Sequence, residues 1–227
     1  SANIVFADAG LEAAVTRGVL HCFGNTGQSC NAPTRMLVEA SVYEEAVAIA
    51  AKVAQSVTLG DPMDKGPHLG PVVSKAQFDK IQGLIQVGID EGARVVAGGV
   101  GRADGFDRGY YVKPTVFAGV HNDMTIAREE IFGPVLVMIP FKDEADAIRI
   151  ANDTPYGLAG YIQSGDLERA RRVARKIRAG SVYLNGNGQD YCSPFGGYKQ
   201  SGNGREWGAF GLHDFLEVKV INGFYPA

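Results

Sequence analysis

The stretch FGNTGQSC, residues 23–30, joins two segments of different periodicity and sets the architecture of the chain. Before it, apolar residues recur at helical spacing over residues 11–23, which predicts an amphipathic helix. After it, residues 35–40 (RMLVEA) are predicted to form a strand, and residues 3–7 form another predicted strand ahead of the helix. Strand, helix, turn and strand together make a βαβ unit, the building block of a parallel sheet.

Predicted strands and helices continue to alternate along the rest of the chain. Helices are expected over residues 43–57, 74–91, 143–151 and 167–178, and strands over 93–97, 110–120, 134–141, 158–163, 181–184 and 215–221. Ser74 with Gln77 is a capping-box pattern, and Asp166 is a candidate cap for the last helix. The predicted fold is α/β, a three-layer αβα domain with a largely parallel sheet, over residues 1–205 with a tail at 206–227.

The composition of the chain argues against several classes of function. The 227 residues are 45% hydrophobic and 21% charged with a net charge of −3, which argues against nucleic acid or an anionic membrane as the main partner. The three cysteines form no CxxC pair and the four histidines are scattered, so we expect a cytoplasmic protein without a metal site. The glycines at 186–188 and 202–204 lack the third glycine of a dinucleotide-binding fingerprint.

Cys30 is the candidate nucleophile. It follows a polar turn with small neighbours, where backbone N–H groups can stabilise a thiolate or an oxyanion. The alternative is a thiol without chemistry, since free cysteine usually packs as a small hydrophobe. Cys22 is expected to face the core. Polar stretches at 128–134 and 185–205 could meet Cys30 at the carboxyl ends of the strands, where ligands of open α/β sheets sit.

Five motifs occur in a fixed order along almost the whole chain: GQSC (27–30), EEIFGP (129–134), SPFGGYK (193–199), SGNGRE (201–206) and LEVKV (216–220). In this combination the chain resembles the NAD(P)-dependent aldehyde dehydrogenase family. The resemblance implies that residues 1–205 are the catalytic (thiol) domain. It also implies that the tail, 206–227, carries a strand that bridges subunits of a homo-oligomer, a dimer or a tetramer.

The resemblance also assigns roles to single residues. Cys30 would attack the aldehyde to give a thiohemiacetal, and hydride loss to NAD or NADP would leave a thioester that water hydrolyses to the carboxylate. The N–H of Cys30 would bind the oxyanion. Glu130 would hold the ribose hydroxyls on the nicotinamide side, with Phe132 beside that ribose and ring. The resemblance places four residues around the substrate: Ser29, Asn31, Asn185 and Phe195.

Parts of the family pattern have no match in this sequence. The Glu-Leu-Gly-Gly-Lys segment with the deacylation base, the oxyanion asparagine and nearly all of the dinucleotide-binding domain are missing. We therefore expect the chain to be a fragment that is inactive as a dehydrogenase by itself. The small or polar residues Gly24, Ser29 and Asn31 favour a small or polar aldehyde.

Three other functions fit the same sequence. In the CoA-acylating branch of the family, CoA rather than water takes the acyl group. A non-catalytic relative is a second possibility, although Cys30, Glu130 and Phe132 are all present. A cysteine hydrolase would need a nearby histidine, and His21 is the histidine within ten residues of Cys30.

Overall fold

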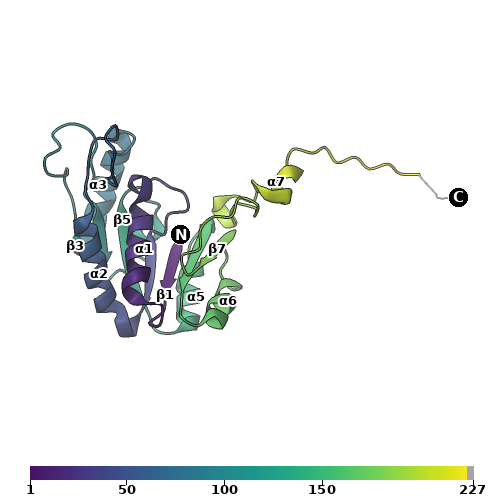
Figure 1. The fold of residues 1–227 in the computed structure, drawn as a ribbon, viewed down its shortest axis with the longest axis horizontal. Helices are drawn as coiled ribbons and strands as arrows, with labels where there is room; N and C mark the ends of the chain where they lie inside the picture. Colours follow the sequence, from purple (N-terminus) through teal and green to yellow (C-terminus); the bar gives the residue numbers. More distant parts are fainter. Residues whose placement is uncertain (224–227) are drawn as a thin grey trace.

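The computed structural model describes residues 1–223, and a seven-stranded sheet runs through them in the order β3-β4-β5-β2-β1-β6-β7 (Figure 1). Neighbouring strands are parallel, except that β3 and β4 are antiparallel. The strands are β1 (Ala2–Val5), β2 (Arg35–Glu39), β3 (Arg94–Ala97), β4 (Thr115–Ala118), β5 (Val135–Phe141), β6 (Ala159–Gln163) and β7 (Ser181–Leu184).

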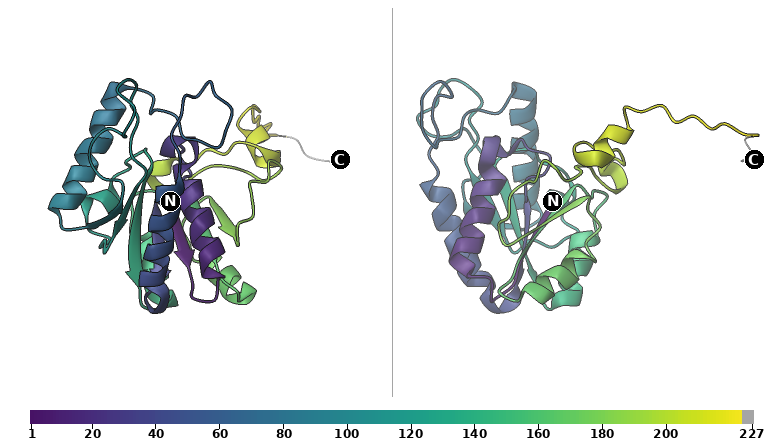
Figure 2. Two further views of the ribbon diagram at one scale, coloured as in Figure 1. Left: turned by 60° about the vertical axis from the view of Figure 1, so that its left-hand side comes forward. Right: turned by 45° about the vertical axis from the view of Figure 1, so that its right-hand side comes forward.

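The sheet is buried on both faces, as the apolar run of β5 shows. Val135, Val137 and Ile139 pack into one hydrophobic cluster, whereas Leu136 and Met138 pack into the other. The first cluster also holds α3 (Lys75–Asp90), α5 (Glu144–Asn152) and α6 (Leu167–Ala174), and the second holds α1 (Leu11–Phe23) and α2 (Tyr43–Ser56). Figure 2 shows α1 and α2 on one side of the sheet and α5 and α6 on the other. The predicted three-layer αβα fold is confirmed.

Side-chain caps begin three of the helices. The hydroxyl of Ser74 accepts from the N–H of Gln77 at 3.2 Å, and Asp166 accepts from the first backbone N–H groups of α6. Asp143 caps α5 in the same way. These oxygens satisfy N–H groups that have no partner within the helix, so the predicted helix starts at Ser74 and Asp166 are confirmed.

Some boundaries differ from the predictions. Helix α6 ends at Ala174, because the side chain of Asn152 binds the carbonyl of Lys176 and the N–H of Arg178 and holds the chain outside the helix. The connector at 124–133 contains a short helix, α4 (Thr125–Arg128), and a second unpredicted helix, α7, spans Gly208–His213. Residues 1–223 also contain three short 3-10 segments: η1 (Gly24–Gly27), η2 (Ala40–Val42) and η3 (Lys199–Ser201).

The predicted strand at 215–221 is wrong for the single chain. Residues 216–223 leave the body of the molecule without regular secondary structure (Figure 1), and Val218 is 92% exposed. A strand needs a neighbour to pair its backbone groups, and none of the described strands runs beside this segment. Across residues 1–223 no helix combines the length and apolarity that a membrane span requires.

Candidate active site

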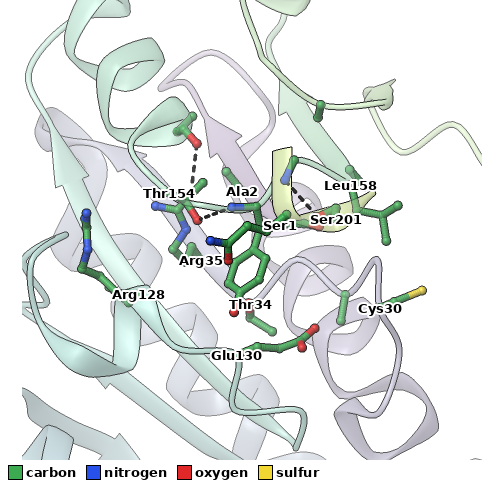
Figure 3. Close-up of a pocket in the computed structure, with 18 of the residues that line it drawn as sticks. Ser1, Ala2, Cys30, Thr34, Arg35, Arg128, Glu130, Thr154, Leu158 and Ser201 are labelled. Carbon is green, nitrogen blue, oxygen red and sulfur yellow. Dashed lines mark hydrogen bonds between the residues drawn. The ribbon is translucent and has the colours of Figure 1, made fainter. Parts of the chain in front are cut away.

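A cavity of about 240 Å³ opens at the amino ends of the parallel strands (Figure 3). Its lining includes the first residues of three strands, Ala2 of β1, Arg35 of β2 and Ala159 of β6. Cys30 and Glu130 also line it, from the loops that lead into β2 and β5. The expected location at the carboxyl ends of the strands is therefore wrong. Both loops precede a strand, and in a parallel sheet all such loops lie at the amino edge.

The turn before Cys30 has an unusual backbone. Asn25, Thr26 and Gly27 have φ values of 51°, 55° and 71°, so they lie consecutively in the left-handed region. A β-branched residue such as Thr26 is rarely found there, and such strain persists only where surrounding contacts enforce it. The hydroxyl of Thr26 donates to the carbonyl of Gly70 at 3.2 Å, and the side-chain oxygen of Gln28 accepts from the N–H of Val73 at 2.9 Å.

Cys30 itself stands in a tight turn. The N–H of Ala32 donates to the carbonyl of Ser29 at 3.0 Å, so Cys30 and Asn31 are the two central residues. The thiol of Cys30 is exposed. Within residues 1–223, the N–H of Cys30 donates no hydrogen bond to another residue. Both groups that a thiol nucleophile needs, the sulfur and an adjacent donor for an oxyanion, are therefore available at one residue.

Backbone packing ties the nucleophile turn to the loop of Glu130 and Phe132. A Cβ atom placed on Gly27 would lie 2.0 Å from the carbonyl oxygen of Gly133 and 2.6 Å from the nitrogen of Pro134. Only glycine fits this contact, since any Cβ would overlap these main-chain atoms. The positive φ of Gly27 disfavours other residues as well. The positions of Cys30 and Glu130 are thus fixed relative to each other by main-chain atoms.

Helix α3 holds the same loop from the other side. The side-chain amide of Gln77 donates to the carbonyls of Ile131 and Phe132 at 3.0 and 2.8 Å, and the Lys80 ammonium donates to the carbonyl of Glu130 at 2.7 Å. Phe132 is half-buried with a φ of 57°. The Glu130 carboxylate is exposed and has no hydrogen-bond or ion-pair partner among the described residues.

The role of Gln77 differs from the capping-box prediction. In a full capping box its amide would return to the N–H of Ser74, but it binds the loop before β5 instead. The spacing from Ser74 to Gln77 fits both arrangements. No local pattern indicates this partner, because the carbonyls lie more than 50 positions away along the chain.

The four predicted substrate residues do not gather at one place. Ser29 lines the cavity. Asn31 is next to Cys30, and its carbonyl accepts from the hydroxyl of Tyr161 at 2.9 Å. Asn185 lies at the opposite edge of the sheet, where its side chain binds both backbone groups of Ser164, with distances of 2.9 and 3.0 Å.

Phe195 also lies outside the cavity lining. Its backbone pairs with that of Glu206, with both hydrogen bonds at 2.7 Å. Its ring lies 5.1 Å from the ring of Trp207, which also contacts Tyr191. The structure thus brings together Ser29, Cys30, Glu130 and Phe132, and it places Asn185 and Phe195 in contacts of their own.

The sequence profile of the aldehyde dehydrogenase family matches residues 1–221. The chain belongs to the aldehyde dehydrogenase family. A 3-succinoylsemialdehyde-pyridine dehydrogenase from a Pseudomonas species is 53% identical over 224 residues, which are 99% of this chain and 47% of that protein. The chain spans about half the length of the curated relatives it matches.

Solved members of the family have the same fold. A cysteine-to-alanine variant of aldehyde dehydrogenase C from Pseudomonas syringae, complexed with NAD+ and octanal, matches with a TM-score of 0.97 and 50% identity. The match covers 100% of this chain and 47% of that one. An aldehyde dehydrogenase from Mycobacterium tuberculosis, complexed with NAD+, gives a TM-score of 0.93 and 44% identity over 100% of this chain and 47% of its own.

In this aldehyde dehydrogenase chain, neither of the other two cysteines is an exposed thiol at the cavity, and the nearby histidine does not bind Cys30. Cys22 is fully buried, and burial raises the pKa of its thiol to about 12. Cys192 is exposed, but it lies on the loop of Phe195 and not at the cavity. His21 sets its ring edge-on against Tyr161, with the centroids 5.0 Å apart, and makes no hydrogen bond to Cys30 within the described residues. Nothing in this arrangement supports the hydrolase alternative.

Two cations bind the end of α5 in this aldehyde dehydrogenase chain, and one of them, Arg35, also lines the cavity. The buried Arg35 guanidinium donates to the carbonyls of Ile150 and Ala151 at 3.2 and 3.0 Å, and burial lowers its pKa to about 10. Lys199, from the SPFGGYK motif, donates to the carbonyls of Asn152 and Thr154. Both side chains satisfy carbonyls at the negative end of the helix dipole. In the part of the chain that the structure describes, no cluster of three or more histidine, cysteine, aspartate or glutamate side chains is placed to bind a metal ion.

Proposed function

We propose that this chain supplies the thiol side of an NAD(P)-dependent active site that oxidises an aldehyde to a carboxylic acid. One observation carries the proposal: the Gly27–Gly133 contact fixes the exposed Cys30 and the Glu130–Phe132 loop at one cavity. Because the chain belongs to the aldehyde dehydrogenase family, we interpret Cys30 as the nucleophile and the Glu130–Phe132 loop as a cofactor contact. The NAD+ complexes of two relatives support the choice of cofactor class.

The residues of the Glu130 loop fit a nicotinamide cofactor. The carboxylate of Glu130, which has no partner among residues 1–223, is an acceptor that matches the two adjacent hydroxyls of a ribose. Phe132, half-buried beside it, offers an apolar surface for the ribose and the ring. When bound, the nicotinamide supplies a hydride acceptor. Gln77 and Lys80 keep the loop in place for that contact.

Cys30 then performs covalent catalysis. Its thiolate attacks the carbonyl carbon, a carbon–sulfur bond forms, and the N–H of Cys30 donates to the resulting oxyanion. Loss of hydride from the thiohemiacetal leaves a thioester on Cys30. Attack by water breaks the carbon–sulfur bond, releases the carboxylate and restores the thiol. The exposed position of Cys30 at the cavity leaves room for both the aldehyde and the water.

The other groups that the reaction needs are proposed to lie elsewhere in the full-length protein. We propose that the deacylation base, a second oxyanion donor and most of the cofactor contacts lie in the part of its relatives' length that this chain does not match. The isolated chain would then lack dehydrogenase activity. We also propose that the tail at 206–227 pairs with a second copy in a cytoplasmic homo-oligomer. Its exposed apolar residues support this arrangement.

The test compares cysteine variants of the full-length protein. Aldehyde-dependent NAD(P)H formation should fall by at least about a thousandfold in Cys30→Ala, the scale seen when a covalent nucleophile is removed. Cys192→Ala is the matched control, because Cys192 is also exposed but lies away from the cavity. Substantial turnover by Cys30→Ala would show that Cys30 is not the nucleophile. NAD(P)H formation by the 227-residue chain alone would contradict the proposed division of the site.

A further inference from the structure

Tyr161 has a fixed place beside the nucleophile turn. It lies on β6 and is only 7% exposed. The ring of Tyr183, from β7, stacks on it with centroids 5.1 Å apart and planes 19° apart, and His21, from α1, meets it edge-on at 5.0 Å and 83°. The contacts with Tyr183 on one side and His21 on the other restrict the ring of Tyr161, so its hydroxyl has a defined position.

That hydroxyl binds the residue next to the nucleophile. It donates to the carbonyl of Asn31 at 2.9 Å, across 130 positions in the sequence. Within residues 1–223, no other donor reaches this carbonyl. The turn is otherwise closed by its own bond between Ala32 and Ser29. Tyr161 therefore ties the Cys30 turn to β6, in addition to the chain's own continuation into β2.

The hydroxyl stays a donor under working conditions. Burial raises the pKa of Tyr161 well above its ordinary value, and the neighbouring Tyr183 and Cys30 raise it further. The phenol is thus protonated at the pH, about 8.5, where a cysteine thiol ordinarily ionises.

We propose that Tyr161 is a positioning residue that orients the thiol and the N–H of Cys30 by holding the carbonyl of Asn31. The inference rests on the proposed function of Cys30 as the nucleophile. The reason is geometric: a nucleophile loses much of its rate when it is displaced by about 1 Å from its attack position. Without the hydroxyl, the carbonyl of Asn31 loses its hydrogen bond to β6, and within residues 1–223 the next main-chain bond to the sheet is at Thr34, so the turn around Cys30 gains freedom.

The test compares Tyr161→Phe with Tyr183→Phe in the full-length protein. Each variant loses one phenolic hydroxyl, but the hydroxyl of Tyr183 donates to Gln189 instead of the Cys30 turn. In Tyr161→Phe we expect kcat to fall about tenfold, equivalent to about 1.4 kcal/mol, with the KM for NAD(P) unchanged. Hydrogen exchange in the peptide covering residues 29–34 should accelerate by a similar factor. Tyr183→Phe should leave both quantities unchanged.

Exchange and turnover separate this inference from the proposed function. Unchanged exchange in Tyr161→Phe, or faster exchange with unchanged kcat, would overturn the positioning role. If the wild-type protein had no turnover, the proposed function would fail, and the exchange comparison would still decide whether Tyr161 holds the turn. If Tyr161→Phe did not fold, His21→Ala would replace it, because that variant removes the edge contact to the ring without touching the hydroxyl. A kcat of His21→Ala that is two to three times smaller than that of the wild type would support the inference. A kcat and an exchange rate equal to the wild-type values would contradict it.

Discussion

Replacing Gly27 by alanine tests the contact that joins the two halves of the site. The new Cβ would lie 2.0 Å from the carbonyl oxygen of Gly133 and 2.6 Å from the nitrogen of Pro134, and main-chain atoms cannot rotate aside. A left-handed φ costs a residue with a Cβ about 1–2 kcal/mol. Forced backbone shifts in a packed site add about 1–3 kcal/mol. The free energy of unfolding should therefore fall by about 2–5 kcal/mol.

This loss has two measurable consequences. The melting temperature should drop by about 4–20 °C, since each kcal/mol is worth about 2–4 °C in a domain of this size. The overlap is relieved only when the Cys30 turn and the Glu130 loop move apart, and a shift of about 1 Å can lower kcat about a hundredfold. Calorimetry and steady-state kinetics on the full-length protein measure the two effects.

Gly24→Ala is the matched control within the same stretch. Gly24 has a φ of −49°, and among the described residues other than its two chain neighbours no atom lies within 4 Å of the position its Cβ would take. Its stability should stay within about 0.5 kcal/mol of the wild-type value. If Gly27→Ala melted and turned over like Gly24→Ala, the main-chain contact would not control the site.

Three further predictions concern the loop of Glu130, the ion pair between α5 and α6, and the core. Gln77→Ala should raise the KM for NAD(P) about 5–30-fold, because the loop of Glu130 loses about 1–2 kcal/mol of hydrogen bonding. Lys75→Ala on the same helix is the control and should leave the KM unchanged. Equal KM values for the two variants would contradict the prediction. The hydrogen bond from Arg172 holds the pKa of Glu144 below its ordinary value of 4.5, so this ion pair stabilises the fold above that pH and its contribution is lost as the pH falls. Melting curves should show a steeper acid decline in the wild type than in Arg172→Met, and parallel declines would refute the link. Cys22, whose pKa is about 12, should resist iodoacetamide near pH 8 until denaturant is added, and labelling of the native protein would contradict its burial.

Much of the fold could be predicted from the sequence because its signals are local. The apolar residues of α1 recur every three or four positions, and the continuous apolar run of β5 fits a strand that is buried on both faces. The helices α4 and α7, with four and six residues, are too short to show a period. The tail at 215–221 has a strand-like pattern, but a strand also needs a neighbour, which the pattern does not supply.

The candidate site was predicted in part, for a similar reason. Cys30, Glu130 and Phe132 stand in motifs, and the structure brings all three to one cavity. The predicted edge of the sheet is wrong, because the rule for ligand sites concerns loops that follow strands, whereas the loops of Cys30 and Glu130 precede β2 and β5. Gln77 and Tyr161 were missed in their positioning roles, since they act on carbonyls far away in sequence and carry no local signal.

Trapping the acyl-enzyme tests most directly whether Cys30 is the nucleophile. The full-length protein would be mixed with an aldehyde and NAD(P)+, quenched in acid before hydrolysis is complete, and digested for peptide mass spectrometry. The acyl mass should appear on the peptide that contains Cys30, and it should be absent without NAD(P)+ and in Cys30→Ala. An acyl group on Cys192, or turnover with no acyl group on Cys30 at any quench time, would contradict the proposed chemistry.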